Sequence, residues 1–360
     1  MKNVVKLAIV GTGWRSGFYI RLAQLQPEIF EIVGIVARSE AARRSMEEKY
    51  KVRTFSSTDE LLRSERPDYV VVAVSWDANP TLVSELVTAG IPVLCETPPA
   101  PDATSLRNLW NEIGSQDLVQ VAEQYLYLPG HAARLAAIGK GLIGLPTSVE
   151  VSSTHGYHAV SMMRGFMGVG YEFATVTARV FEAPLVDPLH RDSWNSDLTA
   201  VPKKTVVGLI DFGDGKSGIY NFVDNQWHNQ LRHRRIVIRG SHGEIVDDKL
   251  VRLANNPAIV TSSFERYQLG YDLNLDGFDT QHISLDGEVL FTNPFVGRRL
   301  MDEEVAINQM MHEMAEWVAG DGPAPYPLRS ACQDHLISLA IDEAIASGGS
   351  ISTERESWAD

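Results

Sequence analysis

The chain has 360 residues, which is long for a single hydrophobic core, so we expect two domains. Its hydrophobic content of 44% and charged content of 22% are typical of a globular protein. The formal net charge of -14 argues against nucleic acid or an anionic membrane as a partner, because both need a basic protein surface.

Residues 1–122 alternate short apolar runs with helix-like segments. Residues 4–10 are apolar and rich in β-branched side chains, which predicts a buried strand, and residues 16–26 have helical periodicity. The alternation continues with expected strands at 32–36, 68–74, 91–96 and 118–122, and with expected helices after Ser39, after Ser57 or Thr58, from Pro80, and at about 103–113. This order predicts βαβ units and a parallel sheet.

A glycine-rich segment, GTGWRSG at residues 11–17, lies between the first strand and its helix. Glycines at this junction allow a tight turn and a close approach of a pyrophosphate to the helix N-terminus. The pattern is incomplete, because Ser16 stands at the third small position. A strand–helix turn without a ligand is the alternative. We predict a dinucleotide-binding site at Gly11, Thr12, Gly13, Trp14 and Arg15.

The residues after the second strand, Ala37-Arg38-Ser39, bear on the choice of cofactor. An acidic residue here accepts a hydrogen bond from the ribose 2′-hydroxyl of NAD, whereas an arginine with small polar neighbours suits the 2′-phosphate of NADP. We therefore predict that Arg38 and Ser39 bind NADP(H), with NAD(H) as the alternative. Arg38 as a solvated residue at the start of a helix is the structural alternative.

Further cofactor contacts are expected at the carboxyl ends of the other strands, where ligands bind in open α/β sheets. Glu96 ends the strand at 91–96 and should face the nicotinamide half of the cofactor. The predicted contacts are Ser75, Trp76, Glu96 and Pro98.

These segments together resemble the Gfo/Idh/MocA family of sugar oxidoreductases. The resemblance rests on GTGWRSG, GIPVLCETPPA, GLIGLPTSVEV and HGYHAVSMMRGFMG, runs through most of the chain and is strongest over residues 1–170. It implies an N-terminal Rossmann domain, then an α/β domain with a large, mostly antiparallel sheet. It also implies hydride transfer between a nicotinamide cofactor and a sugar or cyclitol hydroxyl carbon.

Two positions depart from the pattern of that family. Its motif reads Glu-Lys-Pro, and the lysine acts on the substrate hydroxyl, whereas this chain has Glu96-Thr97-Pro98. Threonine forms hydrogen bonds but supplies neither a positive charge nor a titrating amine. Aligning Gly156-Tyr157-His158 with the family's Gly-x-His places Thr154 where an aspartate is usual. A cis bond before Pro98 would suit such a turn.

Other side chains must therefore supply the acid/base chemistry, or catalysis is lost. His158 carries over from the family pattern, and His155 shares one face with it if both lie in a helix. A histidine is a natural base for a hydroxyl proton as hydride leaves. We predict His158 as acid/base, His155 as its partner or substitute, and Tyr125 and Glu123 as groups that bind substrate hydroxyls or orient a histidine. Thr97 is also a catalytic candidate.

Each histidine and Glu123 has a purely structural alternative, as a buried and hydrogen-bonded core residue. His155, His158 and Glu123 are also metal-ligand types, but we predict no metal, because the resemblance implies none.

Residues 123–360 are expected to form the substrate-binding and oligomerisation domain. From about residue 148 the runs become longer and β-like, and Gly-Asp-Gly at 213–215 and the segment RRIVIRGSHGEIV predict antiparallel hairpins. Amphipathic helices are expected at 302–319 and 328–347. Trp227 lies among polar and basic residues, which suits a sugar-binding face, a subunit interface or a solvated loop. The resemblance implies a homodimer or homotetramer.

Three functions follow from these patterns. The leading one is an NAD(P)-dependent oxidoreductase acting on a sugar- or cyclitol-like alcohol or ketone. The second, suggested by some relatives of the family, is redox-neutral cleavage of a glycoside with transiently reduced bound NAD. The third is a non-catalytic cofactor-binding sensor, suggested by the two replaced positions.

The expected location is the cytoplasm. Cys95 and Cys332 are far apart in the sequence and suggest neither a disulfide framework nor a metal site. Lys6 and the glycines that follow it interrupt the apolar N-terminal run, so no signal peptide is predicted. No run reaches the roughly 18 apolar residues of a membrane helix.

Overall fold

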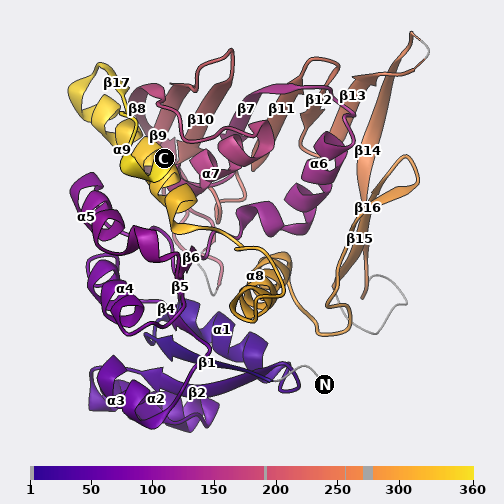
Figure 1. Cartoon of the computed structure of the whole chain (residues 1–360). Coiled ribbons are helices and arrows are strands. Elements are labelled where there is room, and N and C mark those ends of the chain that lie inside the picture. The colour runs from indigo at the N-terminus through magenta and orange to yellow at the C-terminus, as the bar shows by residue number, and fades with distance from the viewer. Residues whose placement is uncertain (1–3, 190–192, 256, 271–278) are drawn as a thin grey trace. The chain divides into compact units, whose positions relative to one another are not determined.

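The computed structural model describes residues 4–189, 193–255, 257–270 and 279–360 (Figure 1). Its residues cluster into two compact units. The first unit comprises Met1–Leu128, Leu269–Thr280 and Asn293–Cys332, and the second comprises Pro129–Gln268, Gln281–Thr292 and Gln333–Asp360. The simple division expected after residue 122 stays a prediction.

The first unit contains a six-stranded parallel sheet, as the alternating pattern predicted. Its order is β3-β2-β1-β4-β5-β6, so the direction of winding reverses between β1 and β4. All four residues of β4 are fully buried, which explains why the strand is apolar without alternation. The strands are β1 Val5–Val10, β2 Phe30–Val36, β3 Thr54–Phe55, β4 Tyr69–Val72, β5 Val93–Cys95 and β6 Val119–Val121.

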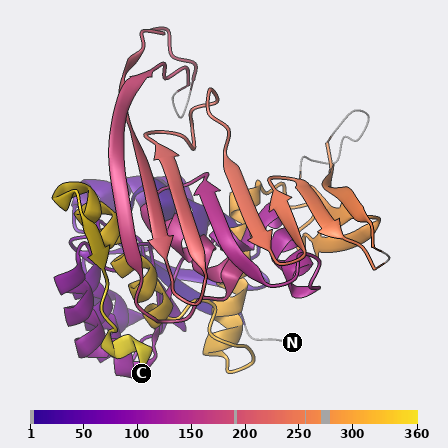
Figure 2. The same cartoon turned by 90° about the horizontal axis from the view of Figure 1, so that it is seen from above.

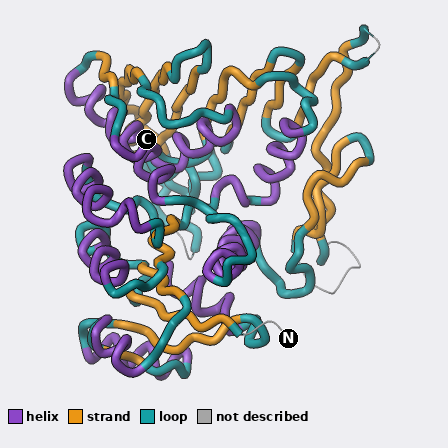
Figure 3. The backbone as a smooth tube through the Cα atoms, in the orientation of Figure 1, coloured by secondary structure: helices purple, strands orange, loops and turns teal. Residues whose placement is uncertain are grey.

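Helices follow these strands in turn (Figure 3). Ser39 and Ser57 accept hydrogen bonds from the amides of Ala42 and Glu60, both at 3.1 Å, so the predicted helix starts are confirmed, with Ser57 rather than Thr58 as the cap. The helices are α1 Trp14–Gln24, α2 Glu40–Tyr50, α3 Thr58–Ser64, α4 Asn79–Thr88 and α5 Ala103–Ile113, with 3₁₀ turns at Gly114–Gln116 and Tyr125–Tyr127.

A helix from late in the chain, α8 (Asp302–Val318), also belongs to the first unit. It packs on α1, and buried amides join the two segments: Gln26 Nε2 donates to Asn308 Oδ1 at 2.6 Å. His312 Nε2 lies 2.9 Å from Gln26 Oε1. The end of α1 is therefore fixed to α8 by polar groups that burial obliges to pair.

The second unit contains an 11-stranded sheet of order β16-β15-β14-β13-β12-β11-β7-β10-β9-β8-β17. β10 pairs with β7 in parallel, and its other side pairs antiparallel with β9. The β9–β10 and β11–β12 hairpins are those predicted from the sequence. The predicted combination of a parallel Rossmann sheet and a large, mostly antiparallel sheet is therefore confirmed.

The strands of this sheet are β7 Pro146–Ser152, β8 Thr175–Leu185, β9 Val201–Asp211, β10 Ser217–Val223, β11 Arg235–Gly240, β12 Gly243–Val246, β13 Lys249–Leu253, β14 Ile259–Gln268, β15 Thr280–Leu285, β16 Glu288–Thr292 and β17 Ser350–Ser352. The helices of this part of the chain are α6 Pro129–Gly139, α7 Gly156–Met167 and α9 Leu328–Ser347, with a final 3₁₀ turn at Ser357–Ala359.

The two faces of this sheet differ. α7 packs on β7 and β10, and the space beside Gly218 is so tight that a Cβ there would lie 2.6 Å from Met163 Sδ. Figure 2 shows the opposite face, where the strands lie side by side. On that outer face Phe181 and Leu209 are 60% and 58% exposed. Among the described residues, no helix has the length and apolar character needed to cross a membrane.

Candidate active site

The glycine-rich turn between β1 and α1 has the geometry of a phosphate cradle. Gly11 has a φ of 119°, and a Cβ there would lie 2.1 Å from the carbonyl oxygen of Ala73, so only glycine fits. Gly13 is the N-cap of α1 and, having no side chain, makes no capping hydrogen bond to the first-turn amides. A Cβ on Gly13 would meet no described atom within 4 Å. An uncapped helix N-terminus beside open space suits the pyrophosphate of a dinucleotide.

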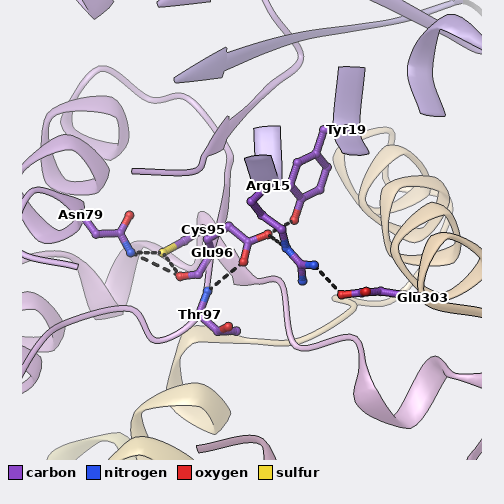
Figure 4. A network of polar contacts seen from close by, with 7 residues as sticks. All are labelled: Arg15, Tyr19, Asn79, Cys95, Glu96, Thr97 and Glu303. Carbon is purple, nitrogen blue, oxygen red and sulfur yellow. Dashed lines mark hydrogen bonds and ion pairs between the residues drawn. The ribbon is translucent and has the colours of Figure 1, made fainter. Parts of the chain in front are cut away.

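A buried polar network joins this turn to the end of β5 (Figure 4). Arg15 Nε donates to Glu96 Oε1 at 2.8 Å, and Arg15 Nη1 donates to Glu303 Oε1 at 2.7 Å. Tyr19, one helical turn after Arg15, donates its hydroxyl to the same Glu96 oxygen. Glu303 lies in the first turn of α8, so the network unites α1, β5 and α8 within the first unit.

Burial sets the electrostatics of this network. Only 14% of the Arg15 side chain and 13% of the Glu96 side chain are exposed. Burial by itself disfavours the guanidinium charge, but the neighbouring Glu96 and Glu303 carboxylates outweigh it and raise the pKa of Arg15. Burial, and then the charge of Glu96, raise the pKa of Tyr19. Arg15 therefore stays cationic and Tyr19 stays a hydrogen-bond donor.

The turn after Glu96 is also stabilised by contacts with α4. The Thr97–Pro98 bond is cis, the form that would suit such a turn. Asn79, which is 2% exposed, directs its Nδ2 at Cys95 Sγ at 2.9 Å and at the carbonyl oxygens of Glu96, Pro98 and Pro99 at 3.3 to 3.4 Å. Burial raises the pKa of the Cys95 thiol to about 12, so it is not a nucleophile at neutral pH.

Thr97 itself is half-buried, and its backbone amide lies 3.3 Å from Glu96 Oε2. In Figure 4 its side chain points away from the Arg15–Glu96 pair. The hydroxyl therefore takes no part in the ionic network. Its predicted contact with substrate stays a prediction.

Of the other predicted cofactor residues of the first unit, Pro98 is buried, whereas those after β2 and β4 are solvent-accessible. Arg38 is exposed, and the Ser39 hydroxyl caps α2. Ser75 and Trp76 are exposed after β4, with Trp76 at 57%. Arg15 differs, because its guanidinium is already bound by two carboxylates of the protein. Its observed role is to fix Glu96.

Glu123 and Tyr125 follow β6 at the same carboxyl edge. Glu123 is fully buried, and its Oε1 accepts a hydrogen bond from the Tyr125 amide at 3.2 Å. Tyr125 is half-buried and begins a 3₁₀ turn. Glu123 thus shapes this turn, and the predicted binding of substrate hydroxyls by either residue stays a prediction.

The histidine pair lies in the second unit. The condition that both histidines lie in a helix is not met, because His155 is the N-cap of α7 with extended dihedrals, φ -83° and ψ 162°. A residue at this position has left the helix, but the His155 and His158 rings still meet edge to face, 4.9 Å between centroids. His158 is 7% exposed, and Thr154 beside the pair is fully buried.

The His155 ring is uncharged near pH 7. Burial of its ring, and then the neighbouring His158, lower the pKa of His155 to about 4. A neutral imidazole at pH 7 has one nitrogen free of a proton, as a general base requires.

Sequence reasoning missed three residues of the site: Tyr19, Asn79 and Glu303. Tyr19 was detectable, because it follows Arg15 at i+4 on one helix face. Glu303 was not, since it lies 288 residues from Arg15 in the sequence. In the described part of the chain, no group of three or more His, Cys, Asp or Glu side chains is arranged to hold a metal ion.

Comparison with known proteins agrees with this geometry. Residues 5–124 match the family model GFO_IDH_MocA, described as an oxidoreductase family with an NAD-binding Rossmann fold. Inositol 2-dehydrogenase of Rubrobacter xylanophilus is 28% identical over 145 residues, which span 39% of this chain and 42% of that protein.

Two solved structures share the whole architecture. Levoglucosan dehydrogenase, in complex with NADH and levoglucosan, superposes with a TM-score of 0.71 at 16% identity, over 98% of this chain and 100% of the other. The WlbA dehydrogenase of Bordetella pertussis, in complex with NADH and UDP-GlcNAcA, gives 0.65 at 18% identity, over 98% and 99%. At these identities the likeness establishes the fold alone.

The network predicts unequal roles for the two carboxylates that bind Arg15. Glu96→Gln removes a carboxylate charge from a side chain that is only 13% exposed. Because this leaves the buried Arg15 with a weaker partner, we expect the free energy of unfolding to fall by about 1–3 kcal/mol. Glu303→Gln is the matched control. Its carboxylate binds the same guanidinium but is 37% exposed, so a loss below about 1 kcal/mol is expected. Urea unfolding measures both, and an equal or larger loss for Glu303→Gln would contradict this ranking.

Proposed function

Because this chain belongs to the Gfo/Idh/MocA oxidoreductase family through its NAD-binding Rossmann domain, residues 5–124, we propose that it transfers hydride between a nicotinamide cofactor and a CH–OH carbon of a sugar- or cyclitol-like substrate. The observation that carries the proposal is the Gly11–Gly13 turn. It joins β1 to an uncapped helix N-terminus, next to the point where the sheet reverses its winding.

The substrate class is proposed from three relatives. One is an inositol 2-dehydrogenase, and the structures of the other two contain levoglucosan and UDP-GlcNAcA. These three ligands share a ring that bears hydroxyl groups. A polyhydroxylated ring is therefore the substrate that we propose for this chain.

The nicotinamide, when bound, supplies the hydride acceptor or donor. The first-turn amides of α1 would hold the pyrophosphate. Glu96, immobilised by Arg15 and Tyr19, would keep the turn at Thr97 and Pro98 in one place. Thr97 would orient a substrate hydroxyl, because threonine donates and accepts hydrogen bonds without titrating.

Proton transfer falls to the histidine pair in this proposal. His158 would take the hydroxyl proton during oxidation or return it during reduction. The lowered pKa of His155 keeps that neighbour neutral near pH 7, so it adds no positive charge that would oppose protonation of His158.

Two other functions remain alternatives, since Thr97 and Thr154 replace the lysine and aspartate of the family pattern. Redox-neutral glycoside cleavage would use the same cofactor cradle with no net change of cofactor. A sensor would bind the cofactor without chemistry. The two imidazoles in edge-to-face contact favour a reaction over a sensor, because histidine can transfer a proton.

We also propose an oligomer built on the outer face of the 11-stranded sheet. Phe181 and Leu209 are exposed there, although exposed apolar clusters are uncommon on monomers. Light scattering after size-exclusion chromatography measures the mass, and a monomer at micromolar concentration would contradict this assembly.

For the cofactor we propose NADP(H), because Arg38 and Ser39 occupy the tip of β2 and no carboxylate follows that strand directly. Arg38→Ala should weaken NADPH binding by roughly tenfold to a hundredfold, the value of a charge-assisted hydrogen bond, and change NADH binding by less than about threefold. Nicotinamide fluorescence titration measures both.

Arg44→Ala is the control, since Arg44 is exposed on α2, the helix that begins just after Arg38 and Ser39, and pairs with Glu40. Its cofactor affinities should equal those of the unchanged protein. Tighter binding of NADH than of NADPH by the unchanged protein would overturn the choice of NADP(H) and leave the oxidoreductase proposal standing.

The proposed role of His158 predicts that its substitution changes kcat but not cofactor affinity. His158→Asn should lower kcat by about 10²- to 10⁴-fold with little change in cofactor affinity, because a general base acts on the chemical step. His242→Asn, an exposed histidine of the same unit, should leave both unchanged. Full activity of His158→Asn would remove His158 from the mechanism.

A further inference from the structure

Three aromatic side chains, Tyr220, Phe222 and Trp227, form a row on the α7 side of the 11-stranded sheet, and the last of them is partly exposed. Tyr220 and Phe222 lie on β10 and stack at 6.3 Å with 15° between their planes. Phe222 and Trp227 then stack at 5.2 Å and 6°. Tyr220 and Phe222 are buried, whereas 38% of Trp227 is exposed. One face of the indole is thus covered by Phe222, and exposed area remains on the same side chain.

A hydrogen bond to the start of α7 fixes the first ring of this row. The Tyr220 hydroxyl accepts a hydrogen bond from the amide of Gly156, the first residue of α7, at 3.0 Å. Because Tyr220 and Phe222 alternate along one strand, they face the same side of the sheet as Gly218, which abuts Met163 of α7. The indole therefore sits at the helix start that carries His155.

The loop that carries Trp227 is fixed by two buried amides. Gln226 Nε2 donates to the carbonyl oxygen and hydroxyl of Ser152, at 2.8 and 3.0 Å, and to the carbonyl oxygen of His233 at 2.8 Å. Asn229 Nδ2 donates to the carbonyl oxygen of Val186 at 2.7 Å. Since Ser152 ends β7 just before the histidine pair, Gln226 sets the distance between Trp227 and His155.

Polar rings border the indole. His155 and His228 each meet it edge to face, with 5.6 Å between centroids. His155 in turn contacts His158. A flat apolar surface with imidazoles at its rim complements a pyranose or cyclitol, whose ring has an apolar C–H face and a rim of hydroxyls.

We propose that the exposed area of the Trp227 indole is the platform on which a pyranose or cyclitol ring stacks, with its hydroxyl rim toward His155 and His158. This platform rests on the proposed function for its substrate class and goes beyond it in assigning the residue that recognises the ring. The rigid loop matters, because a preorganised aromatic side chain loses little entropy when the ligand binds.

A subunit interface is the main competing use of Trp227. Phe181 and Leu209, the exposed residues of the proposed oligomer surface, lie on the other side of the sheet. Leu209 pairs with Ile219, whose side chain faces away from that of Tyr220, and Phe181 is in register with Thr205 and Val223, on the side away from Phe222. Trp227 is therefore not continuous with that surface. This separation favours a small ligand over a second copy of the chain.

The test compares Trp227→Ala and Trp227→Phe with Trp194→Ala, another exposed tryptophan of the same unit. Binding of myo-inositol and methyl β-D-glucopyranoside is measured by saturation-transfer NMR with cofactor present. D-glucitol, an open-chain polyol without a flat C–H face, serves as the comparison ligand.

Trp227→Ala should weaken binding of the cyclic probes by about tenfold or more and abolish their preference over D-glucitol, because the stacking face is lost. Trp227→Phe should retain most of the affinity. Trp194→Ala should stay within about twofold of the unchanged protein, and cofactor affinity should be constant throughout.

The outcomes separate this inference from the proposed function. Unchanged sugar binding in Trp227→Ala overturns the platform, whether or not hydride is transferred. Trp227-dependent binding without any hydride transfer supports the platform and contradicts the oxidoreductase proposal. No binding of either cyclic probe by the unchanged protein, or a loss of oligomer mass in Trp227→Ala, overturns the platform as well.

Discussion

The buried ion pair between Arg15 and Glu96 is the constraint on which the nucleotide end of this protein depends. Neither charge is tolerable in the interior without the other, so α1 and β5 are bound to one relative position. Tyr19 and Glu303 complete the pairing from the next helical turn and from α8. The glycine-rich turn and the cis-proline turn therefore cannot shift independently, and the two ends of a dinucleotide would meet a preformed surface.

In this arrangement, the residues that stabilise the structure differ from those proposed to transfer a proton. In the first unit, the charged groups nearest the expected nicotinamide are used for structure, and Thr97 offers only a hydrogen bond. In the second unit, the side chains proposed for proton transfer are the histidines at the start of α7, next to an aromatic row. The replacement of the family's lysine is understandable if proton transfer has moved to imidazole.

The elements could be predicted where local physics decides them. Fully buried strands such as β4 are apolar throughout, Ser39 caps its helix with its own hydroxyl, and Gly-Asp-Gly turns a hairpin. The site was less predictable, because its partners are distant in sequence. No feature of the sequence around Arg15 indicates that Glu303 will pair with it. The sequence left open whether His155 is helical, and in the structure it is the N-cap of α7, where a residue keeps an extended backbone.

The most direct measurement is the amount of reduced nicotinamide formed when the purified protein is mixed with oxidised NADP or NAD and an excess of myo-inositol or methyl β-D-glucopyranoside. The account predicts many equivalents of reduced cofactor per protein chain, with a rate that depends on His158. One equivalent or less, with cofactor retained on the protein, would indicate redox-neutral chemistry. No binding of either cofactor would contradict the assignment of the Gly11–Gly13 turn as a dinucleotide cradle.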